Sequence, residues 1–181
     1  MPKTLDTQSG FTLIELMLTV IIIGVLSGIV ITIISPTNTR NKAKDGVRAG
    51  TLAKLAQAVE AFTAGENLPP ANETALTAAT SQYVQTWPTD SDFTAASTDN
   101  YRFVRFGAGT SANPYSSCAS VRMATATTYF KYVSPYTNPP MTNWSAVAPN
   151  PANPSGRLLR NCTYGCAAGA SPNSLVGCLA I

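Results

Sequence analysis

One carboxylate, that of Glu15, lies near the start of a long apolar segment and is the residue with the clearest chemical potential. No other charged residue occurs between Phe11 and Thr39. A charge in a membrane-length helix costs about 2.5–3.5 kcal/mol at the bilayer centre and less toward the ends. Where the dielectric constant is low, a carboxylate is stable only if a cation pairs with it. The pattern therefore indicates that Glu15 has a cationic partner.

The apolar segment has the length of a membrane-spanning helix. Its uncharged part, Leu16–Ile34, contains only three polar residues, Thr19, Ser27 and Thr32. As a helix it would be about 28 Å long, close to the hydrocarbon thickness of a bilayer. A secretory signal peptide has a shorter apolar core of about 7–15 residues and a cleavage site after it, whereas here the small residue Gly10 comes before it. An ordinary single-pass anchor with an incidental glutamate is the simpler alternative.

The residues that begin the segment are Gly10-Phe11-Thr12-Leu13-Ile14-Glu15. They resemble the N-terminus of the type IV prepilin family, closely over residues 9–34. The resemblance implies a leader peptide, residues 1–10, that is cleaved after Gly10 by prepilin peptidase, a membrane aspartyl peptidase that also N-methylates Phe11. It also implies assembly into a filament with identical or related pilin subunits, on an inner-membrane assembly platform.

The chemistry of Glu15 is consistent with this resemblance. Cleavage would create an ammonium group on Phe11, four residues from Glu15. Pairing the two groups, in one subunit or between neighbours, would neutralise two charges that are each costly in a bundle of low dielectric constant. We therefore expect Glu15 to act in assembly and to set the axial register of an incoming subunit.

The expected orientation conflicts with one charge rule. Arg40, Lys42, Lys44 and Arg48 follow the apolar segment, whereas only Lys3 and the amino terminus precede it. The positive-inside rule would place the side with more basic residues, the one that follows the apolar segment, in the cytoplasm. The resemblance implies the opposite: a single-pass plasma-membrane precursor whose C-terminal domain lies outside the cytoplasm, and an extracellular filament after assembly. We follow the motif, because dedicated machinery reads the leader.

We expect two successive helical parts, residues 11–35 as a transmembrane and filament-core helix and residues 36–65 as its continuation in a globular domain. Gly24 and Gly28 are four residues apart and would form a small face for close helix packing. Each glycine also lowers helix propensity by about 1 kcal/mol relative to alanine, so local unwinding is an alternative. Pro36 should kink the helix or remove one hydrogen bond.

The second helical part carries an apolar stripe on which a sheet could pack. Its members are Val47, Leu52, Leu55, Val59 and Phe62. Gly65 is the expected stop. A short helix with Asn72 as its N-cap should follow, with Leu76, Ala79 and Tyr83 on one face.

The remaining residues, within an outer globular domain of residues 66–181, predict strands. Alternating or β-branched and aromatic stretches favour five of them: 101–106, 120–125, 128–133, an edge strand at 157–161 and a last strand at 175–181. The second and third would form a hairpin through Ala126-Thr127. The aromatic residues expected in the core are Phe103, Phe106, Phe130 and Tyr132. Helix followed by clustered strands predicts an α+β fold in which a long helix packs on a small antiparallel sheet. This agrees with the pilin fold.

Four cysteines lie in the second half of the chain, Cys118, Cys162, Cys166 and Cys178. Their even number suits an oxidising compartment and predicts a disulfide-bonded C-terminal region. Three connectivities are possible, and we favour Cys118–Cys162 with Cys166–Cys178. A four-cysteine zinc site is the rival, but the spacing fits zinc ribbons poorly.

The residue inventory argues against an enzyme. There is no histidine in the chain, which excludes histidine-dependent catalytic triads and dyads. No phosphate-binding glycine loop occurs, and we expect no cofactor or metal. Asp90 and Asp92 could form a carboxylate pair or a calcium loop, but we expect them to occupy a solvated turn.

Two other roles remain open beside a structural pilin. A type II secretion pseudopilin is the nearer one, although relatives that form the main pseudopilus often hold calcium through acidic residues in a C-terminal loop. No Asp or Glu follows Asp99, so that site cannot be built there. The other is a minor tip pilin that binds DNA or another polyanion. Residues 100–181 carry six cations and no side-chain carboxylate. The cations are Arg102, Arg105, Arg122, Lys131, Arg157 and Arg160.

Overall fold

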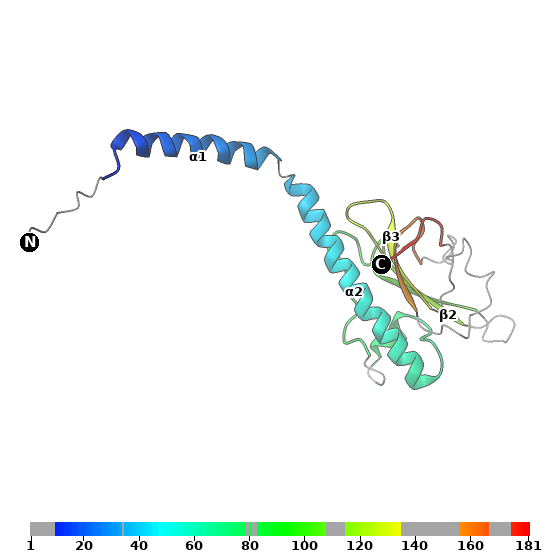
Figure 1. Ribbon diagram of the computed structural model, residues 1–181. Coiled ribbons are helices and arrows are strands. Elements are labelled where there is room, and N and C mark those ends of the chain that lie inside the picture. Colours follow the sequence, from blue (N-terminus) through cyan, green and yellow to red (C-terminus); the bar gives the residue numbers. More distant parts are fainter. Residues whose placement is uncertain are drawn as a thin grey trace, which may run out of the picture. The chain divides into compact units, whose positions relative to one another are not determined.

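The computed structural model describes residues 10–33, 35–78, 80, 83–107, 115–134, 156–166 and 175–181. The chain forms two compact units, Met1–Thr39 and Arg40–Ile181. We call the second the globular unit. The elements of both units are labelled in Figure 1.

The first unit contains helix α1, Leu13–Ile33. It is helical throughout, including at Gly24 and Gly28, where an added Cβ would meet nothing within 4 Å. The expected packing face is therefore open in the single chain. The expected leader, except for Gly10, lies outside the described residues.

Helix α2 spans Pro36–Glu66. Pro36 is its first residue, a position where the missing N–H is not needed, so the proline begins a new helix rather than kinking a longer one. At the other end the helix continues one residue past the expected stop at Gly65. Asn67 then takes a left-handed conformation with φ 54°. Gly65 instead provides space, because a Cβ there would lie 2.5 Å from the Tyr83 hydroxyl oxygen.

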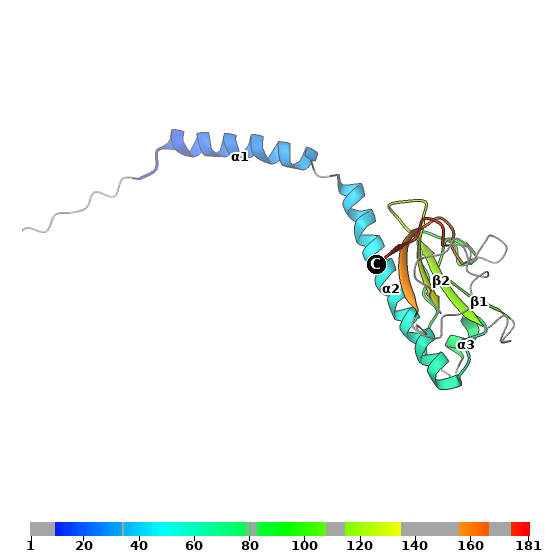
Figure 2. The ribbon, with the colours of Figure 1, turned by 45° about the vertical axis from the view of Figure 1, so that its right-hand side comes forward.

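The globular unit contains a five-stranded antiparallel sheet in the order β1-β2-β3-β4-β5. The strands are β1 Arg102–Phe106, β2 Ser116–Arg122, β3 Tyr129–Ser134, β4 Arg157–Cys162 and β5 Leu179–Ala180. Figures 1 and 2 show α2 lying along one face of this sheet. The predicted α+β, pilin-like class is therefore confirmed: a long helix packs on a small antiparallel sheet.

The expected hairpin is present, with a different boundary. β2 and β3 pair as far as Arg122 and Tyr129, and the turn closes with a 2.8 Å bond from Met123 N to Thr128 O. β2 begins at Ser116, four residues before the expected start. Its extra residues pair with β1, for example Cys118 with Val104, so tertiary pairing lengthens a stretch of weak β propensity.

The predicted edge strand is wrong. β4 lies inside the sheet, between β3 and β5, and the short β5 is the edge. Only two residues of β5 pair with β4, Leu179 with Arg160 and Ala180 with Leu159. The last strand is therefore shorter than the expected 175–181.

The core between α2 and the sheet contains most of the predicted stripe. Leu52, Leu55 and Val59 are buried and Phe62 packs partly buried against them. Val47 is the exception, since 69% of its surface is exposed. The inward positions at this end of α2 are taken by Asp45 and Arg48, which precede Leu52 at helical spacing.

The aromatic residues of the strands are distributed over both faces of the sheet. Phe103, Phe130 and Tyr132 are buried in the core that faces α2. Phe106 packs against the opposite face, where it is partly buried beside the cysteines.

The short helix α3, Glu73–Thr77, starts as expected. The Asn72 side chain accepts a 3.0 Å bond from Ala75 N. Leu76 is buried, but the helix ends before Tyr83, whose ring meets that of Phe62 at 5.3 Å. Ala79, the third predicted member of the face, lies outside the described residues.

The four cysteines form two disulfides, but the favoured pairing is wrong. The bonds join Cys118 to Cys166 and Cys162 to Cys178, with Cα–Cα distances of 5.8 and 4.2 Å. β3 separates the strands of Cys118 and Cys162, and strands two apart in a sheet lie about 10 Å from each other. That exceeds the reach of a disulfide, whose Cα atoms lie about 4.4–6.8 Å apart.

The face of the sheet opposite α2 also buries a lysine. Lys131, in the middle of β3, has no exposed surface, and burial lowers the pKa of its ammonium group to about 8 from 10.5. Between these two values the unfolded chain binds more protons than the folded one, so the free energy of unfolding increases with pH.

We predict that the free energy of unfolding rises by about 2 kcal/mol between pH 7 and pH 9.5 because Lys131 loses its proton. Lys131→Met should abolish most of this rise, whereas Lys54→Met, which alters an exposed lysine of α2, should leave it unchanged. Urea unfolding, followed by circular dichroism at several pH values, measures how the free energy of unfolding of each variant changes with pH. An unchanged slope in Lys131→Met would contradict the prediction.

Candidate functional site: the amino-terminal helix and a polar network on α2

The bond predicted to be cleaved lies before α1, in an open stretch of chain. Gly10 and Phe11 are both exposed, Phe11 over 84% of its surface, and neither belongs to a helix. A peptidase needs an accessible bond, and this position is exposed and lies outside the helix.

Glu15 lies in the first turn of α1. A carboxylate is stabilised there, because the unpaired N–H groups make a helix N-terminus electropositive. The backbone of this turn is closed by bonds from Glu15 N and Leu16 N to Thr12 O, at 3.1 and 3.2 Å. No ion pair to Glu15 forms within the part of the chain that the structure describes. Any cationic partner of the Glu15 carboxylate would therefore lie outside the described residues.

The surface of α1 is apolar on all sides. Large side chains from Leu13 to Ile29 are 49–78% exposed, and they point in every direction around the helix. The polar residues do not interrupt this surface, since Thr19 Oγ1 bonds to Leu16 O at 2.9 Å and Ser27 Oγ to Ile23 O at 2.7 Å. A helix that is apolar all round is stable only when other apolar groups cover it.

No helix in the described ranges satisfies both the length and the hydropathy requirements for crossing a membrane.

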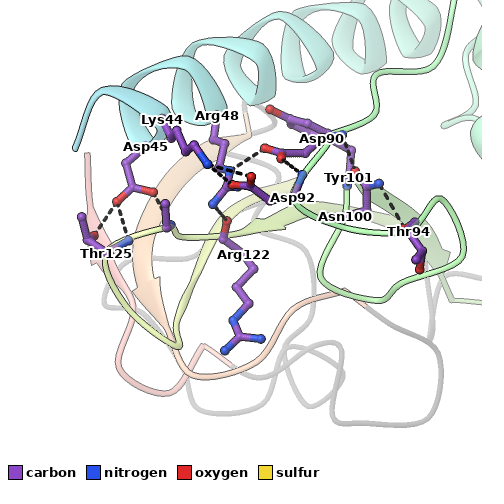
Figure 3. A network of polar contacts seen from close by, with 11 residues as sticks. Lys44, Asp45, Arg48, Asp90, Asp92, Thr94, Asn100, Tyr101, Arg122 and Thr125 are labelled. Carbon is purple, nitrogen blue, oxygen red and sulfur yellow. Dashed lines mark hydrogen bonds and ion pairs between the residues drawn. The ribbon is translucent and has the colours of Figure 1, made fainter. Parts of the chain in front are cut away.

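In the globular unit, a polar network takes the place of the apolar stripe near the start of α2. Its centre is Arg48, which is 1% exposed. Its Nε lies 2.6 Å from Asp90 Oδ2 and its Nη2 lies 2.7 Å from Asp92 Oδ2. Nη1 donates to Arg122 O at 3.2 Å, and the guanidinium carbon lies 4.9 Å from the Phe93 ring centre. Figure 3 shows Arg48 and Lys44 pointing from α2 toward the two aspartates.

The same aspartates are tied to each other and to Lys44. Lys44 Nζ lies 2.7 Å from both oxygens of Asp92, and Asp92 N donates to Asp90 Oδ1 at 2.8 Å. The hydrogen bond from Arg48 lowers the pKa of the Asp90 carboxyl group below its usual value, despite partial burial. Both carboxylates are therefore paired with cationic side chains of α2.

Asp45 binds a second segment, the turn between β2 and β3. Its carboxylate accepts bonds from Ala124 N at 2.5 Å, from Thr125 N at 3.1 Å and from the Thr125 hydroxyl group. Because Asp45 and Arg48 are neighbours on one face of α2, the helix holds this turn and the loop of Asp90 side by side (Figure 3).

A fourth ion pair extends the network across the sheet. Arg122 Nη1 lies 2.7 Å from Asp99 Oδ2, and the Tyr129 hydroxyl donates to Asp99 Oδ1 at 2.6 Å. Burial acts to raise the pKa of the Asp99 carboxyl group, but the bonds from Tyr129 and Arg122 lower it overall. Burial and the neighbouring Asp99 raise the pKa of Tyr129 to about 12.

The predicted solvated turn is confirmed only in part: Asp92 lies in an exposed turn, but both Asp90 and Asp92 are ion-paired. The sequence did not reveal the partner, Arg48, because it lies 42 residues away in an apolar helical pattern. Within the described residues, no group of three or more potential ligands could hold a metal ion.

Residues 5–31 match the prokaryotic N-terminal methylation motif, which is typical of type IV prepilins and pseudopilins. This motif covers the predicted cleavage site, Glu15 and most of α1. No curated protein and no solved structure matches the chain.

We predict that Arg48→Gln lowers the free energy of unfolding by about 2–3 kcal/mol. The value lies below the usual 3–5 kcal/mol for breaking a buried pair, because the Asp92 side chain is still 34% exposed and can recruit water. Lys44→Gln is the matched control, since it removes a more exposed cation from the same aspartate and should cost under about 1 kcal/mol. Urea denaturation measures both, and equal effects of the two substitutions would refute a central role for Arg48.

Proposed function

We propose that the chain is a structural subunit, a pilin, of a type IV pilus or related filament, cleaved after Gly10 and assembled through α1. The observation that carries the proposal is the position of the methylation motif. It covers the predicted cleavage site and most of α1, a helix that is apolar on all sides and whose one charged residue, Glu15, forms no ion pair among the described residues.

Processing would change the chemistry of this end of the chain. The motif implies cleavage by prepilin peptidase, and cleavage converts the amide nitrogen of Phe11 into an ammonium group. In a bundle of α1 helices this group and Glu15 would have no water to solvate them, so pairing them removes two charges at once. The pair would favour the one axial position of an incoming subunit that brings the opposite charges together.

The apolar surface of α1 supports both stages of this pathway. In the precursor the surrounding groups would be lipid, and in the filament they would be α1 helices of identical or related subunits, assembled at an inner-membrane platform. Gly24 and Gly28 offer a face where another helix could approach closely, because a Cβ added at either position would meet nothing within 4 Å.

The globular unit would form the surface of the filament. Two disulfides join its C-terminal segments, and such bonds persist in oxidising surroundings outside the cytoplasm. The ion pairs of α2 with Asp90 and Asp92 hold the long loop before β1, which would help to keep this surface ordered.

A type II secretion pseudopilin is the nearest alternative, and the same motif would serve it. The acidic residues that could suggest a calcium loop, Asp90 and Asp92, are occupied by Arg48 and Lys44. This supports a pilus subunit over a calcium-dependent pseudopilin. Copy number per filament and the effect of gene deletion on secretion would separate the two.

The arrangement of the six C-terminal cations lends little support to a DNA-binding tip subunit. Arg122 is paired with Asp99, Lys131 is buried, and Arg102 lies 3.8 Å from Glu73 and donates to Ala96 O. Arg105 donates to Pro69 O. Only Arg157 and Arg160 of β4 remain well exposed, and two cations make a weak site for a polyanion.

We predict that Glu15→Ala is inserted into the membrane and cleaved after Gly10 but yields at least about tenfold fewer filaments, because the new ammonium group loses its counter-ion. Mass spectrometry of the mature amino terminus and the yield of sheared filaments measure the two steps. Glu66→Ala, which removes an exposed carboxylate at the end of α2, is the control and should assemble normally. A normal filament yield from Glu15→Ala, or native protein that retains its first ten residues, would refute the proposal.

A further inference from the structure

The first turns of α2 carry cations that the globular unit does not neutralise. Arg40 and Lys42 are exposed, and neither forms an ion pair within the described residues. With Lys44 they form what we call the basic collar, Arg40, Lys42 and Lys44. Arg40 and Lys42 lie on different sides of the helix, since two residues turn an α-helix by about 200°.

The nearby carboxylates are already used. Asp45 accepts its bonds from the β2–β3 turn, and Asp90 and Asp92 bind Arg48 and Lys44. No acidic residue occurs between Glu15 and Asp45 in the sequence. The collar therefore keeps at least two positive charges for a partner outside this chain.

The place of the collar in the chain indicates the partner. Two residues join Ile33, the end of α1, to Pro36, and the three Cα–Cα steps span at most about 11 Å. Arg40 and Lys42 lie about 6 and 9 Å further along α2. The headgroup layer on each side of the hydrocarbon is itself about 5–8 Å thick, and these side chains extend several ångströms more. If α1 occupies the bilayer, the collar lies within reach of the phosphate groups where α1 leaves it.

We propose that the basic collar binds anionic phospholipid headgroups and so holds the membrane-bound subunit at the leaflet from which the globular unit emerges. The inference rests on the membrane stage of the proposed function. Guanidinium and ammonium groups donate strong charge-assisted bonds to phosphate oxygens. The binding also removes the conflict with the positive-inside rule, because the cations are neutralised by lipid on the side where the motif places them. Release of these headgroups would accompany transfer of the subunit into the filament.

The test uses the full chain, purified from membranes and reconstituted into vesicles with spin-labelled phosphatidylglycerol or phosphatidylcholine. Electron paramagnetic resonance measures the fraction of each lipid that the protein immobilises. We expect about 25-fold selectivity for phosphatidylglycerol, lowered about fivefold by Arg40→Gln or Lys42→Gln, nearly abolished in the double variant and weakened by 1 M salt.

Lys54→Gln is the matched control. It removes an exposed cation from the same helix, about 18 Å beyond Lys42 and therefore outside the screening length of about 8–10 Å. Its lipid selectivity should equal that of the unmodified chain. An equal loss in Lys54→Gln, or selectivity that persists in the double variant, would overturn the inference.

The outcomes separate this inference from the proposed function. If the double variant assembles poorly but keeps its lipid selectivity, the collar binds a neighbouring subunit and the inference is wrong. If Glu15→Ala assembles normally while collar variants lose selectivity, the filament mechanism fails and the lipid contact stands.

Discussion

The buried guanidinium group of Arg48 is the interaction on which the globular unit depends, because it joins three segments that lie far apart in the sequence. α2 supplies the cation, the loop before β1 supplies Asp90 and Asp92, and the end of β2 supplies the carbonyl of Arg122. Removing such a charge from water costs several kcal/mol, and only good geometry with full hydrogen bonding offsets it. Bonds of 2.6 and 2.7 Å to two carboxylates meet that requirement. The ion pairs of Arg48 add less to the net free energy of unfolding than to the choice of a single loop conformation. Only one position of the loop before β1 brings its carboxylates to the buried guanidinium group.

The two faces of the sheet are stabilised by different means, and the difference follows from what each face can bury. Against α2, Leu52, Leu55 and Val59 meet the inward aromatic side chains, so apolar burial suffices. On the opposite face the core consists largely of the four cysteines with Val133 and Leu159. A disulfide stabilises chiefly by restricting the unfolded chain, which compensates for a small apolar core. The short β5, with two paired residues, retains its place beside β4 because Cys178 is bonded to Cys162.

How far the sequence predicted this structure depended on whether the decisive contact was local. The N-cap at Asn72, the hairpin after β2 and the stripe from Leu52 to Phe62 each rest on neighbours within one element or turn, and all are present. The disulfide pairing and the interior position of β4 depend on strand order, which periodicity does not encode. The charged end of the buried face was missed for a related reason. The hydrophobic pattern predicted that Val47 faces the core. Asp45 and Arg48 are buried there instead, because partners far along the chain neutralise them.

Charge and apolarity divide the chain in a way that suits a subunit with two successive environments. α1 carries one charge at its start and none before its end, so lipid or other α1 helices can cover it equally well, and its axial position is decided only where charges pair. The globular unit needs no such partner, because its loop and turns are neutralised from within by α2. The first turns of α2 lie between these two parts of the chain. They carry two cations, Arg40 and Lys42, that form no ion pair within the described residues. In the proposed pathway these charges therefore have to be satisfied first by headgroups and later by water or neighbouring subunits. The step that withdraws α1 from the bilayer must accordingly break the contacts at this collar while forming the one at Glu15. Extraction and docking are then coupled through Glu15 at the start of α1 and the basic collar in the first turns of α2.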